Sequence, residues 1–338
     1  MSPKVGLFLL WQYIDVALCS DGVLSMLINS NSVALLHCKQ YLRQEITEAV
    51  DRLGAALQFK VTAGIRVLLK PNLLSGRSAG HLACTHSEFV AAVAQWFVEQ
   101  GALVSIGDSP AFGSAQGVMR STGIEEALGK LPVARINFDC SEPVRLAGGV
   151  KVNVARASLE CDMLINLPRV KAHSQFYMTL AVKNYFGTVV GFQKPGWHLR
   201  YGNEVDKFAS HLVDLLTVLP AGMTFMDGIV AMHCTGPLSG LPYSLGLVGG
   251  ALNPVALDSA LLQILRLDFE KSVIWQECAK RALAGSDPDM LDFPLLKPAE
   301  FTAKGFRVPA TLKPVSFNPL RMVVSGCKRF AARLKESS

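Results

Sequence analysis

Short strands and helices alternate along most of this chain, and this alternation limits its fold more than any other feature. The apolar runs SVALLHC, IRVLLKPN, LVSIGDSP and CDMLINLP are separated by segments such as LRQEITEAVDRLGAAL, in which apolar residues recur with a helical period. Short apolar runs rich in branched side chains indicate strands, and a helical period indicates amphipathic helices. The sequence therefore predicts an α/β fold with a mostly parallel sheet and flanking helices.

The pattern divides the 338 residues into three parts. Residues 1–31 form an N-terminal extension, whose short apolar run is interrupted by Gln12 and Asp15 and is too short to span a membrane. No convincing small-residue cleavage site follows that run, so a signal peptide is not indicated. Residues 32–285 are the predicted α/β domain. Residues 286–338 combine a Pro-rich surface segment with a basic terminal helix.

The composition narrows the classes of partner. Half of the residues (50%) are hydrophobic and 18% are charged, which is more apolar than a typical soluble domain. We therefore expect extensive burial, and a homodimer interface or a redox protein partner is compatible with it. The 33 Lys and Arg against 27 Asp and Glu give a net charge of +6, which suits a small anionic substrate. Outside the C-terminus, the clustered basic and aromatic residues of a nucleic-acid binder are missing, so we expect no nucleic-acid partner.

The cysteines indicate free thiols in a reducing, cytoplasmic compartment. No two of them form a C-x-x-C pair, so we expect neither a disulfide scaffold nor an iron–sulfur cluster. The eight are Cys19, Cys38, Cys84, Cys140, Cys161, Cys234, Cys278 and Cys327. The segment HLACTH places His81, Cys84 and His86 close together, but no second group of ligands completes a metal site.

Polar residues gather where the predicted strands end. The strand-like runs end at Lys70-Pro71-Asn72, at Asp108-Ser109, at Asn166 followed by the polar turn of Arg169, Lys171 and His173, and at Asp227. A further helix carries Lys183 and Asn184. In open parallel sheets, ligands bind at the carboxyl ends of the strands. We therefore expect one site along this edge.

The residue types at that edge suggest roles. His173 is the expected acid/base, because its pKa lies near neutrality, and Lys183 and Asp108 are the other candidate catalytic residues. Lysines neutralise carboxylate or phosphate and amides orient it. The candidate substrate-binding residues are Lys70, Asn72, Ser109, Lys171, Asn184 and Asp227. The motifs of serine hydrolases, P-loop enzymes and dinucleotide-binding folds are missing.

The ordered motifs KPNLL, IGDSP, INLPRVKAH, TLAVKNYFGTVVG and MDGI resemble the family named domain of unknown function 362, from about residue 33 to 270. Arg169 stands where this family usually has Lys, which keeps the charge but alters its geometry. Many members carry a two-cluster ferredoxin module with C-x-x-C-x-x-C repeats, which this chain lacks. The resemblance implies redox-linked chemistry, without an inherited cluster.

A fainter likeness is to the nickel-pincer lactate racemases. In those enzymes a catalytic His, a cofactor-bearing Lys and a metal-binding His follow one another, as His173, Lys183 and His198 do here. This likeness implies His198 as a candidate metal ligand. The leading expectation is an enzyme, an oxidoreductase or an isomerase, that acts on a small anionic substrate. The alternatives are a non-catalytic accessory or electron-transfer protein and a pincer-type racemase or epimerase.

Overall fold

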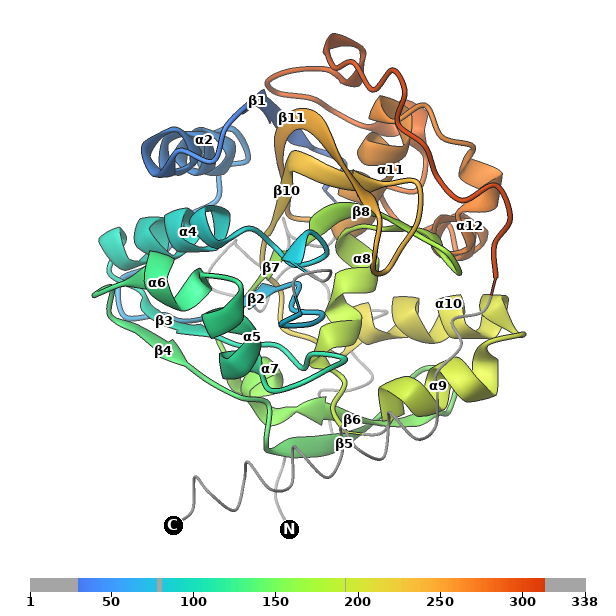
Figure 1. Cartoon of the computed structure of the whole chain (residues 1–338), viewed down its shortest axis with the longest axis horizontal. Helices are drawn as coiled ribbons and strands as arrows, with labels where there is room; N and C mark the ends of the chain where they lie inside the picture. Colours follow the sequence, from blue (N-terminus) through green and yellow to red (C-terminus); the bar gives the residue numbers. More distant parts are fainter. Residues whose placement is uncertain (1–29, 78–80, 192, 314–338) are drawn as a thin grey trace, which may run out of the picture.

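A large mixed sheet forms the centre of the computed structural model, which describes residues 30–77, 81–191 and 193–313 (Figure 1). Its strands are β1 (Ala34–His37), β2 (Arg66–Pro71), β3 (Leu103–Ile106), β4 (Val133–Arg135), β7 (Met163–Leu167), β8 (Arg169–His173), β9 (Tyr177–Thr179), β10 (Thr224–His233) and β11 (Leu241–Ala251). Two further strands, β5 (Ser141–Arg145) and β6 (Lys151–Ala155), form a separate antiparallel pair.

The main sheet is parallel in its middle and antiparallel at one edge. Its order is β1-β11-β10-β7-β2-β3-β4, with β8 beside β10 and β9 beside β8. The pairs from β10 through β7, β2 and β3 to β4 are parallel, as is the pair of β8 with β10. Strand β11 runs antiparallel to both β10 and β1. The predicted α/β class with a mostly parallel sheet is confirmed.

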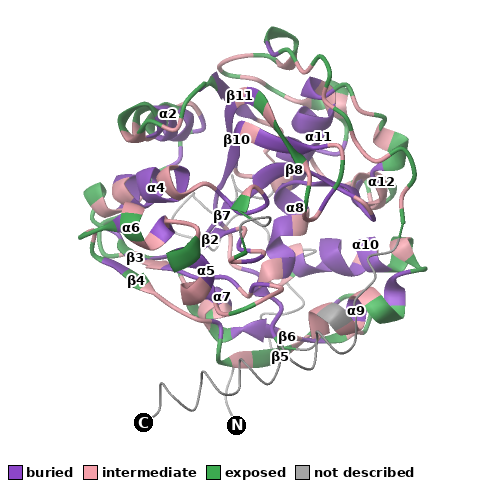
Figure 2. Ribbon diagram, viewed as in Figure 1, coloured by how far each residue is buried: buried purple, intermediate pink, exposed green. Residues whose placement is uncertain are grey.

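Helices cover both faces of this sheet. They are α2 (Arg43–Ala56), α4 (Ser87–Glu99), α5 (Ala115–Ser121), α6 (Ile124–Leu128), α7 (Arg156–Glu160), α8 (Ala181–Asn184), α9 (Gln193–Tyr201), α10 (Val205–Asp214), α11 (Pro254–Ile264) and α12 (Val273–Lys280). Successive side chains of a strand point to opposite faces. In β2, Val67 and Leu69 join the core under α2 and α4, while Leu68 joins the core beneath α10 and α12. Figure 2 shows the buried residues concentrated in the sheet and on the inner sides of these helices.

Local structure differs from the sequence pattern at three places. The helical segment after β3 is two helices, because Gly123 adopts a left-handed φ of 77° between α5 and α6. The segment from Arg169 to His173, expected as a polar turn, is strand β8. Helix α9, from QKPGWHLRY, was not expected, because its Pro and Gly obscure a helical pattern.

The two ends of the chain fall mostly outside the described residues. The N-terminal extension, apart from residues 30 and 31, and the basic terminal helix lie there. Residues 286–313 carry the short 3₁₀ helices η6 (Pro288–Met290) and η7 (Pro298–Glu300), and they bury Phe301 in the core beside α11. Among the helices that the structure describes, none is long and apolar enough to cross a membrane.

Candidate active site

Strand β8 brings three cationic or titratable side chains to one face of the sheet. Because the side-chain period of a strand is two, Arg169, Lys171 and His173 share a face, while Val170 and Ala172 join the core on the other side. All five residues are buried. The polar face of β8 therefore lies inside the protein, where each charge needs a partner or a ligand.

Lys171 begins a chain of amide hydrogen bonds that crosses the strand ends. Its Nζ donates to Asn72 Oδ1 and to the carbonyl oxygen of Ala83, each at 2.8 Å. Asn72 Nδ2 donates to Asn184 Oδ1 at 2.7 Å, and Asn184 Nδ2 donates to Asn166 Oδ1 at 2.8 Å. These acceptors are neutral, and burial lowers the pKa of Lys171 to about 8.

Lys70 and Asp108 form a buried ion pair. Lys70 Nζ lies 2.9 Å from Asp108 Oδ1, and Asp108 Oδ2 accepts a 2.8 Å hydrogen bond from the amide of Leu73. Burial lowers the pKa of Lys70, and the charge of Asp108 opposes that shift. Gly187 packs directly on the pair, because a Cβ at this position would overlap Asp108 Oδ1 and Lys70 Nζ.

Ser109 lies next to this pair and is held through its backbone. Its amide donates to the carbonyl oxygen of Gly187 at 3.1 Å. Lys194 Nζ, from α9, donates to the carbonyl oxygens of both Ser109 and Gly187. The sequence reasoning missed Lys194, which ties α9 to two of the expected site segments.

Asp227 and Arg169 belong to a second buried network. The Tyr41 hydroxyl donates to Asp227 Oδ1 at 2.8 Å, and the backbone amide of His86 donates to Asp227 Oδ2 at 3.0 Å. Arg169 donates to the Tyr41 hydroxyl and to the carbonyl oxygens of Val230 and Cys84. Both carboxylate oxygens of Asp227 are thus engaged by the protein itself.

His173 is held as a neutral imidazole. Its Nδ1 accepts hydrogen bonds from the backbone amides of Gln175 at 3.0 Å and Phe176 at 3.2 Å. Because Nδ1 accepts, the ring proton resides on Nε2. Burial, with a smaller contribution from Lys183, lowers the pKa of His173 well below its usual value. The group can donate a hydrogen bond through Nε2 across the neutral range.

Lys183 stands at the end of α8 over an aromatic surface. Its Nζ lies 4.8 Å from the ring centroid of Phe176 and 5.9 Å from that of Phe186. Within the part of the chain that the structure describes, this half-buried ammonium makes no hydrogen bond and no ion pair. Burial, reinforced by the charges of Lys171 and Lys194, lowers the pKa of Lys183 to about 7.

Asp258 fixes the helix that carries Lys183. Its two carboxylate oxygens accept hydrogen bonds from the amides of Ala181 at 2.6 Å and Val182 at 3.2 Å. Asp258 comes from α11 and is buried, and burial raises its pKa to about 7. No sequence motif pointed to this residue, because its partners are backbone amides distant in the sequence.

The candidate metal ligands do not assemble into a site among the described residues. His198 Nδ1 lies 2.9 Å from Gln175 Oε1, and burial lowers the pKa of this histidine to about 3. Tyr41 stacks on His86, while Cys84 packs against Ser75. Residues 30–77, 81–191 and 193–313 hold no group of three His, Cys, Asp or Glu side chains that could bind a metal.

Residues 67–263 match the family described as domain of unknown function (DUF362). The chain belongs to the DUF362 family. It is also 35% identical over 309 residues to a thylakoid-associated protein of Synechocystis sp.. This match covers 89% of this chain and 95% of the Synechocystis protein. The expected family membership, based on motifs from Lys70 to Asp227, is confirmed.

Two solved structures are similar in part to this DUF362 chain. The lactate racemase apoprotein of Thermoanaerobacterium thermosaccharolyticum has a TM-score of 0.42 and 12% identity, covering 69% of this chain and 57% of that chain. A Thermotoga maritima protein has a TM-score of 0.41 and 12% identity, covering 62% and 56%. This chain thus spans little more than half the length of either structure.

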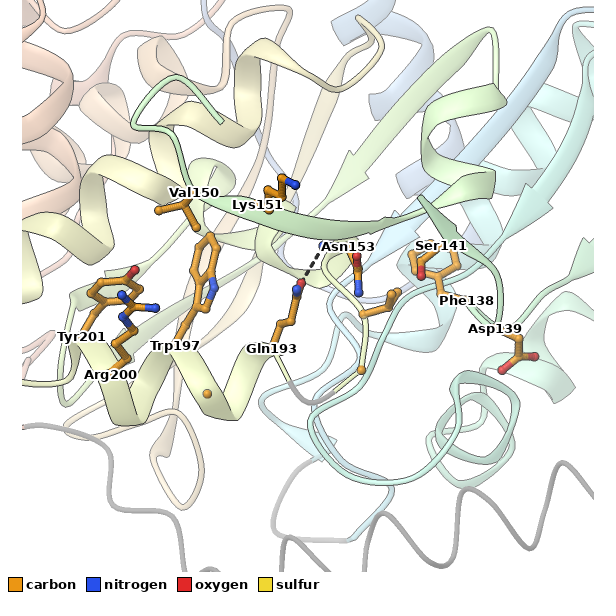
Figure 3. Close-up of a pocket in the computed structure, with 13 residues that line it drawn as sticks. Phe138, Asp139, Ser141, Val150, Lys151, Asn153, Gln193, Trp197, Arg200 and Tyr201 are labelled. Atoms are coloured by element: carbon orange, nitrogen blue, oxygen red, sulfur yellow. Dashed lines mark hydrogen bonds between the residues drawn. The ribbon is translucent and has the colours of Figure 1, made fainter. Parts of the chain in front are cut away.

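The DUF362 chain also has a cavity of about 710 Å³. It lies between the β5–β6 pair and α9, as Figure 3 shows. None of the residues predicted from the sequence as site residues lines it. The cavity therefore shares no lining residue with the predicted site, and α9 contributes side chains to both.

Proposed function

We propose that this DUF362 protein is an enzyme that moves a proton on a small anionic substrate held at the carboxyl edge of the sheet. Lys183 is the general base, and His173 donates a hydrogen bond to the substrate oxygen on which charge develops. One observation carries the proposal: an amine with a pKa near 7 stands beside a neutral imidazole inside the protein.

The charges favour an anion as the substrate. Lys171 is fully buried and bonds only neutral oxygens, and Lys183 has no carboxylate partner in the described ranges. An isolated buried charge is costly unless an opposite charge neutralises it. Asn72, Ser109 and Lys183 are partly exposed, which supports entry of a small molecule from their side. A carboxylate or phosphate would complete the site.

The protonation states of Lys183 and His173 support proton transfer as the reaction. A base is most effective when its pKa lies near the working pH, and a pKa of about 7 leaves a large share of Lys183 as the free amine. His173 Nε2–H supplies a fixed donor inside a water-poor site, where such bonds stabilise developing charge strongly. His173 therefore takes the part of donor, and the base is Lys183.

Asp108 takes a supporting part in this proposal. It pairs with Lys70 and opposes the lowering of its pKa, and it holds the backbone amide of Leu73, so the loop that carries Asn72 stays in place. Asp227 likewise orders Tyr41 and the start of α4, instead of contacting substrate. Lys171, Lys183, Asn72, Asn184 and the backbone at Ser109 are left as the substrate-binding groups.

The test measures how fast carbon-bound hydrogens of a candidate substrate exchange for deuterium in deuterated water. A panel of small carboxylates and phosphate esters is incubated with the protein, and loss of carbon-bound protons is followed by proton NMR. We expect exchange on at least one compound, and about a hundredfold loss with Lys183→Met. Lys130→Met, at an exposed lysine, removes the same charge outside the cluster and should keep the rate.

His173 needs a substitution that spares the fold. Asn at this position retains an acceptor for the amides of Gln175 and Phe176 but removes the Nε2 donor. We expect His173→Asn to have a higher thermal unfolding temperature than His173→Ala. Both variants should lose exchange activity to the same extent. Full exchange activity in both variants would remove His173 from the mechanism.

The relative's name favours a second candidate, an accessory protein associated with membranes. The Synechocystis protein is named thylakoid-associated. Sedimentation with vesicles of anionic and neutral lipids tests this function, and binding without any exchange activity would favour it. Redox-linked chemistry and a cytoplasmic location stay predictions, and an absorption spectrum with metal analysis of the purified protein tests the redox part.

A further inference from the structure

The cavity beside α9 has walls of two kinds. Its volume of about 710 Å³ lies within the range of sites for small organic ligands. Aromatic walls come from Phe138, Trp197 and Tyr201, and polar ones from Ser141, Asn153 and Gln193. Figure 3 shows Trp197 and Gln193 side by side on α9, both directed toward β6, with Phe138 and Ser141 at the far end. Such surfaces accept flat rings by stacking and edge contacts.

The cavity is also weakly cationic. Lys151 and Arg200 line it and are exposed, against the single carboxylate of Asp139. Arg200 stands over the ring of Tyr201, with its guanidinium carbon 5.5 Å from the ring centroid. A guanidinium that is fixed on an aromatic ring loses little freedom when it binds a carboxylate or phosphate. Arg200 and Tyr201 therefore lie together at one end of the cavity.

Hydrogen bonds hold the walls at a fixed separation. Gln193 Oε1 accepts from the amide of Asn153 at 2.6 Å, and the amide of Val190 donates to the carbonyl oxygen of Asn153 at 3.0 Å. A bridge between Val154 and Val189 continues this contact. The cavity is thus a formed site, built where β6 meets the segment that leads into α9.

We infer that this cavity binds a flat aromatic molecule with one anionic group, at a site distinct from the Lys183 cluster. The ring lies against Trp197, and the anionic group meets Arg200 and Lys151. Helix α9 presents Lys194 and His198 to the Lys183 cluster and Trp197 and Arg200 to this cavity. A bound ligand would therefore stabilise α9, whose Trp197 also stacks on Phe186 beside Lys183.

Calorimetric titration with 1-naphthyl phosphate tests this inference. The comparison ligands are 1-naphthol, which has only the ring, and inorganic phosphate, which has only the anion. We expect the phosphate ester to bind more tightly than either half. Lys151→Gln with Arg200→Gln should weaken that binding about tenfold or more. The matched control, Lys130→Gln with Arg120→Gln, removes two exposed charges elsewhere and should leave it unchanged.

Three results would overturn the inference. One is no detectable binding of 1-naphthyl phosphate, and another is equal binding by the Lys151/Arg200 double variant. The third is inorganic phosphate or 1-naphthol that binds as tightly as the ester. Lys183→Met should bind the ester like the parent protein, so this result does not depend on the proposed proton transfer.

Discussion

At the scale of single residues, Gly187 shows how little room surrounds the buried ion pair. A Cβ at this position would overlap both Asp108 Oδ1 and Lys70 Nζ, so Gly187→Ala must separate them. Breaking a buried ion pair leaves uncompensated charge inside the protein. We expect Gly187→Ala to lower the free energy of unfolding by about 3 kcal/mol, measured by urea denaturation.

Gly196→Ala is the matched control for that substitution. Gly196 lies within α9, and an added Cβ would meet nothing within 4 Å. Because Ala favours helix over Gly, this variant should gain up to about 1 kcal/mol. Equal stability of the two variants would contradict the close packing of Gly187 on the ion pair.

The sequence predicted this cluster better than it predicted the roles within it. Lys70, Asn72, Asp108 and Lys171 were expected together because the carboxyl ends of parallel strands share one edge. The partners of the charged side chains were not predictable. For example, the Tyr41 hydroxyl donates to Asp227, which lies 186 positions away in the sequence. Such partners come together only in the folded protein, so no local sequence pattern predicts them.

At the scale of elements, α8 is held by a carboxylate from another helix. Asp258 accepts the first amides of α8, and its pKa of about 7 lies above the usual value near 4. The folded state therefore binds more protons than the unfolded state between about pH 4 and 7, so stability falls as the pH rises through this window.

Asp258→Asn should remove that dependence. Relative to this variant, the parent protein should lose on the order of 3 kcal/mol of unfolding free energy between pH 4 and 7. Urea denaturation at several pH values measures the difference between the two proteins. Parallel pH profiles for both proteins would show that Asp258 has an ordinary pKa.

Strand β8 and helix α9 explain why part of the site was not foreseen. Period-two alternation is a reliable strand signal when one face is polar and exposed, but both faces of β8 are buried. The cations of RVKAH therefore suggested a turn. In α9, Pro and Gly obscured a helix whose Lys194 and His198 both contact the cluster.

At the scale of the whole molecule, the parallel sheet order places the ends of β2 and β7 side by side. Lys70 pairs with Asn166 in register, so both strands deliver polar residues to one place. The α/β class was predictable from alternating periods, whereas the strand order and the antiparallel β11 were not. Long-range pairing is set by packing of entire layers, which local periodicity does not encode.

The cationic cluster should also affect overall stability. The pKa of Lys183, lowered to about 7, lies below its unfolded value near 10.4, so the unfolded state binds more protons between those values. Stability should then rise with pH through this window. Relative to Lys183→Met, the parent protein should gain stability from pH 7 to pH 9.5 in urea denaturation. A constant difference between the two proteins would contradict the lowered pKa.

The pKa of Lys183 tests the account most directly. Lysines labelled by reductive methylation with ¹³C-formaldehyde give resonances that report their charge, and Lys183→Arg identifies the resonance of Lys183. We expect that resonance to titrate near pH 7. A Lys183 resonance that titrates near the ordinary lysine value of about 10.4 would show an ordinary ammonium and would contradict its role as the base.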